Sequence, residues 1–103
     1  MQLEELGVLV KELREANGMT TEELAQVSGL SYGFISMLEN RRGGTPNPKT
    51  LEKLAQGFGL HVLVLLGFLY LEEINVFNPE LGEVYTGLKQ KYFLGKTQRK
   101  GMK

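Results

Sequence analysis

Two short helical patterns separated by only three residues are the feature that most constrains the fold of this chain. The patterns cover residues 21–28 and 32–40. Before the first pattern, Thr20 can accept a hydrogen bond from the amide three residues on while Glu23 reaches back, which is a capping box. Gly29 stands directly after this pattern, where glycine adopts a left-handed conformation at little cost, and Ser31 can cap the next helix. The sequence therefore predicts two short helices joined by a tight turn.

Further helical patterns flank this pair. Apolar residues spaced three or four apart indicate amphipathic helices over residues 2–17, 50–58, 61–71 and 79–92. Because short apolar runs do not distinguish helix from strand, a strand over 68–77 is a second interpretation. Asn78, Pro79 and Glu80 form a good helix start, whereas the basic residues 96–103 are expected to be frayed. The expected fold class is all-α.

Few residues in this chain are suited to catalysis. The 103 residues include no Cys, no Asp and one His, at position 61. This composition excludes disulfides and thiolate zinc sites, and we find neither a nucleophile–base pair nor a glycine-rich phosphate loop before a helix. We therefore expect no enzymatic activity, no metal and no cofactor.

The length and the hydropathy pattern indicate a single soluble domain. The chain has room for one compact domain and a short appendage. No stretch approaches the roughly 20 apolar residues of a membrane span, and the acidic N-terminus is unlike a secretory signal. We expect a cytoplasmic protein that does not contact a membrane.

Charge is distributed unevenly along the chain. Twelve Lys and Arg balance twelve Glu, but residues 1–40 hold seven Glu against two cations, whereas residues 41–103 hold ten cations against five Glu. A net charge of zero argues against a nucleic-acid partner. The uneven distribution reverses that argument, because the positive half of the chain can lie on phosphate groups.

The predicted pair of helices suits DNA recognition, because the first can lie across the DNA backbone while the second enters the major groove. Such packing requires a small residue where the helices touch, a glycine at the turn and apolar residues facing inward. The residues that meet these demands are Ala25, Gly29, Ile35 and Leu38, with Leu24 and Leu30 completing the inner face.

At these residues the chain resembles the Cro and phage-repressor-like (XRE) family of five-helix DNA-binding domains. The matching text is MTTEELAQVSGLSYGFISMLENRR, followed by TLEKLAQGFGL and VLVLLG, and the resemblance covers about residues 3–67. It implies a helix-turn-helix domain over residues 1–70, and from the residues themselves we expect 71–103 to be a helical C-terminal extension with a dimerisation helix and a basic tail. The implied function is a transcriptional regulator, a repressor in the first interpretation and an activator in the second, that binds double-stranded DNA at a pseudo-palindromic operator.

The resemblance also implies particular DNA contacts. The residues that would face the major groove are Ser31, Tyr32, Gly33, Ser36, Met37 and Asn40. The residues that would contact phosphate are Thr21, Arg41, Arg42, Lys49 and Thr50, the last through its backbone amide. The family commonly pairs an arginine of the first helix with a glutamate ending the third. Arg14 and Glu39 occupy these positions, so we assign both to structure.

Two features depart from the family's pattern. The groove-facing set contains no Arg, Lys or Gln, the residues best suited to bidentate base contacts. Base readout would then depend on Asn40, on hydroxyl groups, on thymine methyl groups packed against Tyr32 or Met37, and on DNA shape. In addition, the loop over residues 41–48 is longer than the family's usual connection.

The fifth helix is more apolar than the family's pattern, which often has polar residues at the positions of Val62 and Val64. If these residues are exposed, they belong to an apolar patch, and such a patch indicates an interaction surface. We therefore expect a homodimer through residues 62–93, which would suit two half-sites about 34 Å apart. The residues expected at the interface are Val62, Val64, Phe68, Leu69, Leu71, Leu81, Tyr85 and Leu88. The alternative is that the stripe from Leu81 to Tyr92 folds back on its own domain.

A protein-interaction module is the second functional hypothesis. An antitoxin or anti-regulator would bind another protein through the apolar C-terminal segment, and the neutral groove-facing set and the acidic first half favour this interpretation. The basic tail allows two readings, a disordered solubilising segment or an arm that contacts DNA.

Overall fold

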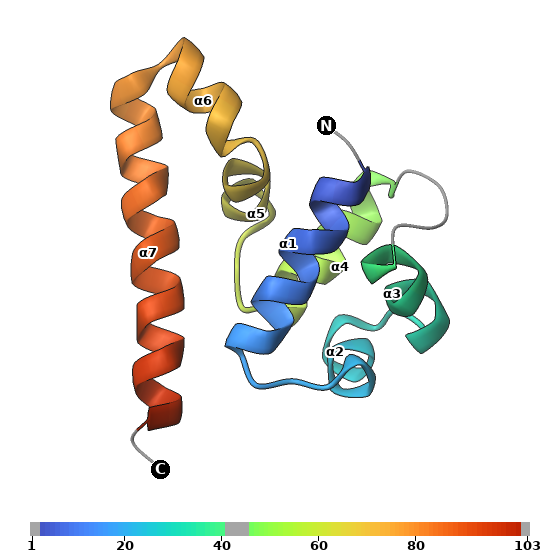
Figure 1. The fold of residues 1–103 in the computed structure, drawn as a ribbon. Coiled ribbons are helices and arrows are strands. Elements are labelled where there is room, and N and C mark those ends of the chain that lie inside the picture. The colour runs from blue at the N-terminus through green and yellow to red at the C-terminus, as the bar shows by residue number, and fades with distance from the viewer. Residues whose placement is uncertain (1–2, 41–45, 102–103) are drawn as a thin grey trace.

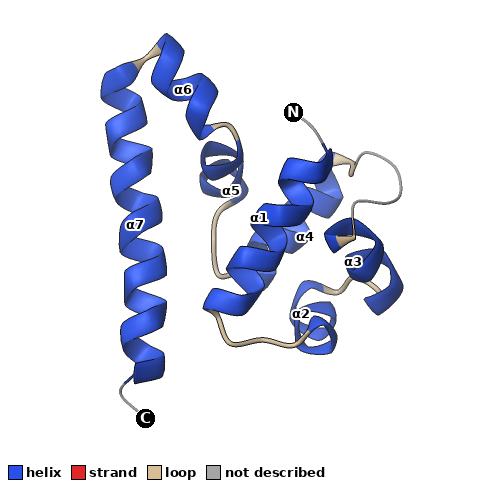
Figure 2. Cartoon of the chain, viewed as in Figure 1, coloured by secondary structure: helices blue, strands red, loops and turns tan. Residues whose placement is uncertain are grey.

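The computed structural model describes residues 3–40 and 46–101, and every regular element within them is a helix (Figures 1 and 2). The helices are α1 (Leu3–Ala16), α2 (Thr21–Ser28), α3 (Tyr32–Glu39), α4 (Pro48–Gly57), α5 (Val62–Leu69), α6 (Leu71–Phe77) and α7 (Pro79–Gly101). The all-α prediction is confirmed, and the alternative of a strand over 68–77 is wrong. Helix α7 continues to Gly101 where a frayed tail was expected, because Lys, Gln and Arg are good helix formers.

A single apolar core lies among the first five helices. Each helix contributes the residues of its inner face, as the three-to-four spacing predicts. The side chains buried there are Leu6, Leu9, Val10, Leu13, Leu24, Ile35, Leu38, Leu51, Leu54, Ala55, Phe58, Leu65 and Phe68. Helix α1 lies beside α3, α5 and α7, so it connects α3 with the C-terminal helices (Figure 1).

The crossing of α1 and α3 is close because Gly7 has no side chain. A Cβ atom at Gly7 would collide with the backbone carbonyl of Leu38. Since backbone atoms cannot move aside as a flexible side chain can, this position requires glycine. The contact fixes the C-terminal end of α3 against α1.

Helices α6 and α7 form a hairpin after a break at Tyr70. The predicted fifth helix therefore ends at Leu69, and α6 follows as a separate element. Gly82 of α7 lies against Asn75 of α6, where a Cβ atom would collide. The Asn78 side chain accepts a hydrogen bond from the Leu81 amide at 3.1 Å, as expected for a cap at this helix start.

The hairpin folds back on the first five helices through aromatic side chains of α7. The Tyr85 ring covers Gly67 of α5, leaving no room for a Cβ atom there. The Tyr92 hydroxyl donates to the carbonyl of Phe58 at 2.8 Å and accepts from Nδ2 of Asn17 at 2.8 Å. Tyr92 therefore joins the ends of α1 and α4 to α7.

The fold-back changes the environment of residues expected at a dimer interface. Phe68 is 4% exposed and its ring lies edge-on to Tyr92, with centroids 6.3 Å apart. The expectation that Phe68 is part of an exposed patch is therefore wrong, because α7 of the same chain covers it. Val62, Val64, Leu69 and Tyr85 are half-buried and pack against the same core.

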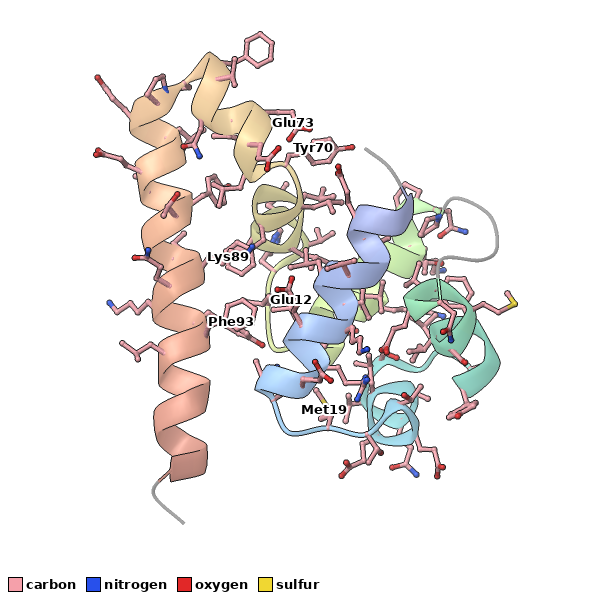
Figure 3. All side chains as sticks on the ribbon, in the orientation of Figure 1. Glu12, Met19, Tyr70, Glu73, Lys89 and Phe93 are labelled. Atoms are coloured by element: carbon pink, nitrogen blue, oxygen red, sulfur yellow. The ribbon has the colours of Figure 1, made fainter. Side chains whose placement is uncertain are left out.

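A cleft of about 350 Å³ remains between α1 and the hairpin. Glu12 of α1 and Lys89 of α7 both line it, and Figure 3 shows their side chains extending from these two helices into the space between them. The hairpin thus contacts the rest of the chain at aromatic anchors and not along its whole length.

Within residues 3–40 and 46–101, no single helix is long and apolar enough to cross a membrane. Only α4 and α5 taken together reach that length and composition, and they meet at an angle of 98°.

Candidate nucleic-acid interface

Helices α2 and α3 are joined by a turn whose backbone is fully specified by the local sequence. Thr20 and Glu23 form a capping box, with hydrogen bonds of 3.1 and 2.8 Å. Gly29 has φ of 76°, the left-handed region, and its amide donates to Ala25 at 3.0 Å. The Ser31 hydroxyl accepts from the Phe34 amide at 3.1 Å and begins α3. These three local features predicted from the sequence are all present.

Helix α3 presents one face to the core and another to solvent. Ile35 and Leu38 are buried, which leaves the N-terminal turn and the opposite face open. Tyr32 is 54% exposed and Met37 is 45% exposed. The residues predicted to face a major groove all lie on this helix or at its caps, and they are exposed except for the half-buried Ser36; they are Ser31, Tyr32, Gly33, Ser36, Met37 and Asn40.

Asn40 is the only amide side chain in this set, and it is already engaged. Its Nδ2 donates to the backbone carbonyl of Ser36 at 2.8 Å. Reading adenine with two hydrogen bonds requires both the amide nitrogen and the amide oxygen. The same nitrogen also lies 3.5 Å from Oγ of Ser36, so its donors are directed within the helix, while Oδ1 is open as an acceptor.

The C-terminal end of α3 is braced by Arg14 from α1. Its Nε and Nη2 donate to the two carboxylate oxygens of Glu39 at 2.8 and 3.0 Å, and Nη1 donates to the carbonyl of Met19 at 2.9 Å. The hydrogen bonds that Arg14 donates to Glu39 raise the pKa of Arg14. Because the two side chains are only 15% and 9% exposed, the pair is well shielded and fixes the orientation of α3.

Three helix N-termini could offer backbone donors to phosphate, but they differ in charge. The first turn of α2 carries Glu22 and Glu23, both exposed, which disfavours a phosphate near the predicted contact Thr21. The first turns of α3 and α4 hold no acidic residue. The N-termini of α3 and α4 are therefore better suited to anions than that of α2.

The start of α4 corrects one predicted contact. Asn47 caps this helix, and its Oδ1 accepts from the Thr50 amide at 2.8 Å. That amide was expected to donate to phosphate, but the cap already occupies it. Lys49 beside it is exposed and remains suitable for a phosphate contact. Sequence reasoning missed Asn47, although the pair Asn47–Pro48 repeats the Asn–Pro start recognised at residues 78–79.

The remaining predicted positions lie in different settings. Arg41 and Arg42 fall outside the described residues. Of the residues predicted to form a dimer interface, Leu81 and Leu88 are exposed, at 41% and 42%. Leu71 is half-buried and lines the cleft between α1 and the hairpin.

The exposed short helix α3 is held across the short helix α2 by a tight glycine turn, and an ion pair braces it from behind. This arrangement is that of the helix-turn-helix class. A helix-turn-helix family model matches residues 10–65, more than half of the chain. The chain belongs to the helix-turn-helix family of the Cro and phage-repressor (XRE) type, a family of DNA-binding transcriptional regulators.

Two relatives from Bacillus subtilis (strain 168) are similar to this chain. One is the uncharacterized HTH-type transcriptional regulator RghRB, 47% identical over 49 residues, which are 48% of this chain and 35% of that protein. The other is the HTH-type transcriptional repressor RghR, 35% identical over 74 residues, which are 71% of this chain and 55% of that protein. The aligned segments thus span about a third and about half of these relatives. No solved structure gives a significant match.

Proposed function

We propose that this chain is a transcriptional repressor that binds a pseudo-palindromic DNA operator as a dimer. The observation that carries the proposal is the open N-terminal face of α3, which is exposed at Tyr32 and Met37 while the opposite face is fixed in the core. A helix held in this way can enter a major groove without rearranging the domain. The repressor assignment rests on similarity to RghR, which is named as a repressor.

Residues 1–70 would contact DNA and residues 71–103 would mediate dimerisation. Phosphate contacts would come from Lys49, from the N-termini of α3 and α4, and from Arg41 and Arg42. The dimer surface would be the outer face of the hairpin, because the described residues leave its apolar side chains exposed. Val76 is 76% exposed and Phe77 is 86% exposed, and Leu81, Val84 and Leu88 continue this surface along α7.

Selection from a random-sequence duplex library at about 150 mM salt tests the proposal. We expect enrichment of a two-fold symmetric site. Lys49→Ala should weaken binding to that site and reduce the dependence of log K on log salt by about one, because one phosphate contact is lost. Lys91→Ala, which removes an exposed lysine of α7, is the matched control and should bind as the parent does. Failure to enrich any sequence contradicts the proposal.

A protein-interaction module is the second candidate, and the exposed apolar face of the hairpin favours it. Tyr70, Ile74, Phe77 and Leu81 line a groove there, together with the polar residues Glu73 and Asn78. If no DNA sequence is enriched but the hairpin still binds another protein, this second function is the correct one.

A further inference from the structure

Gly33 has no structural reason to be glycine. It lies in the first turn of α3 with an ordinary helical φ, since the positive values belong to Gly18, Gly29 and Gly59. A Cβ atom at Gly33 would meet nothing within 4 Å. Glycine is also less favourable than alanine in a helix. The fold therefore gains nothing from a glycine here, in contrast to Gly7, where a Cβ atom would strike backbone.

The missing side chain leaves a notch between two exposed apolar side chains. Met37 lies one turn further along the same face, four residues on, and Tyr32 precedes the notch. Both side chains are about half exposed, as given above. A group entering the notch would reach the α3 backbone, because nothing lies within 4 Å of an added Cβ atom.

The exposed face of α3 has few polar side chains that could form two hydrogen bonds with a base. The described groove-facing set carries no cation, and Nδ2 of Asn40 is held by the Ser36 carbonyl. The apolar group that a major groove presents is the C5 methyl of thymine. Its size matches a notch that is one side chain deep, on a surface where the apolar side chains of Tyr32 and Met37 are also exposed.

We propose that the notch over Gly33, between Tyr32 and Met37, receives a thymine methyl group and makes Gly33 a specificity-determining residue. The inference rests on the proposed function, because it requires that α3 enters a major groove. Gly33 acts by admitting the methyl group to the helix backbone, while the neighbouring side chains supply the apolar contact.

Thymine-to-uracil substitution tests this directly, because it deletes only the methyl group. Each thymine of the selected operator is replaced in turn, and affinity is measured by fluorescence anisotropy. We expect one position in each half-site to lose about fourfold in affinity, the fold-change that corresponds to one buried methyl group. In Gly33→Ala the thymine and uracil operators should bind equally, and the thymine operator should bind more weakly than it does to the parent chain.

Gly95→Ala is the matched control, because Gly95 also lies in a helix with nothing within 4 Å of an added Cβ atom. It should retain the full preference for thymine. The inference alone is overturned if an operator is enriched but no thymine is sensitive to uracil, or if Gly33→Ala keeps the preference. If no operator is enriched, the proposed function fails first and the inference fails with it.

Discussion

At the scale of single residues, Tyr92 contributes to the structure in a way that its sequence position does not reveal. Its hydroxyl lies between the Asn17 side chain and the Phe58 carbonyl and forms a hydrogen bond with each. The sequence places Tyr92 on an apolar stripe, which indicates burial but not the partner. Partners 75 and 34 residues away depend on how α7 is placed, and local periodicity carries no information about that placement.

Tyr92→Phe should lower the free energy of unfolding by about 1–3 kcal/mol, because it leaves the Phe58 carbonyl without its donor. Urea denaturation followed by circular dichroism measures this change. Tyr32→Phe removes an exposed hydroxyl and is the control, with an expected change within about 0.5 kcal/mol. Equal effects of the two substitutions would contradict the role assigned to Tyr92.

The same residue predicts a dependence of stability on pH. Burial raises the pKa of Tyr92 above its ordinary value of 10.0, and this outweighs the opposing hydrogen bond from Asn17. The folded state therefore holds the phenol proton more tightly than the unfolded state, so the stabilisation is complete below about pH 10 and is lost as the pH rises further. The alkaline loss of stability should be smaller in Tyr92→Phe than in the parent chain, as measured by urea denaturation between pH 8 and pH 11.

At the scale of elements, the sequence predicts α2, the turn and α3 closely because their signals are local. The Thr20 capping box, Gly29 and the Ser31 cap each act within a few residues. The break at Tyr70 is different, since no glycine or proline marks it and the apolar run continues through it. Tertiary packing of α7 over Gly67 accompanies the end of α5, and no local pattern encodes that contact.

The crossing of α1 and α3 gives a prediction at this scale. Gly7→Ala should reduce stability by about 1–3 kcal/mol despite the better helix propensity of alanine, because the new Cβ atom meets the Leu38 carbonyl. Thermal unfolding of the variant measures the loss. Gly87→Ala adds the same atom to α7 where nothing lies within 4 Å, so it should be neutral or stabilising. A stable Gly7→Ala variant would show that the two helices can move apart at little cost.

At the scale of the whole molecule, the fold-back of α7 separates its apolar residues into two groups. The sequence places all of them on one stripe. Tyr85 and Tyr92 face the chain's own helices, whereas Leu81, Val84 and Leu88 remain outside. Periodicity identified the apolar residues of α7 but could not assign them to the inside or outside. That assignment depends on which side of α7 meets the domain, and therefore on the aromatic anchors.

The outer face leads to the last prediction. Light scattering at micromolar concentration should give a dimer for the parent chain, and Leu81→Lys with Leu88→Lys should give the 11.6 kDa monomer, because two charges would be buried at the interface. Val27→Lys, on an exposed valine of α2 outside residues 62–93, should remain dimeric. A parent chain that is monomeric throughout would contradict dimerisation.

The Tyr92 contacts also set an order of events during folding. The buried residues of the core all lie between Leu6 and Phe68, so most of the core can form while the C-terminal segment is still unstructured. The hydrogen bonds to Asn17 and Phe58 close loops of 75 and 34 residues, which are slow contacts because the chain must lose much entropy to make them. During synthesis α3 can therefore be in place before α7 docks. When the native protein opens locally, we expect the hairpin to detach first.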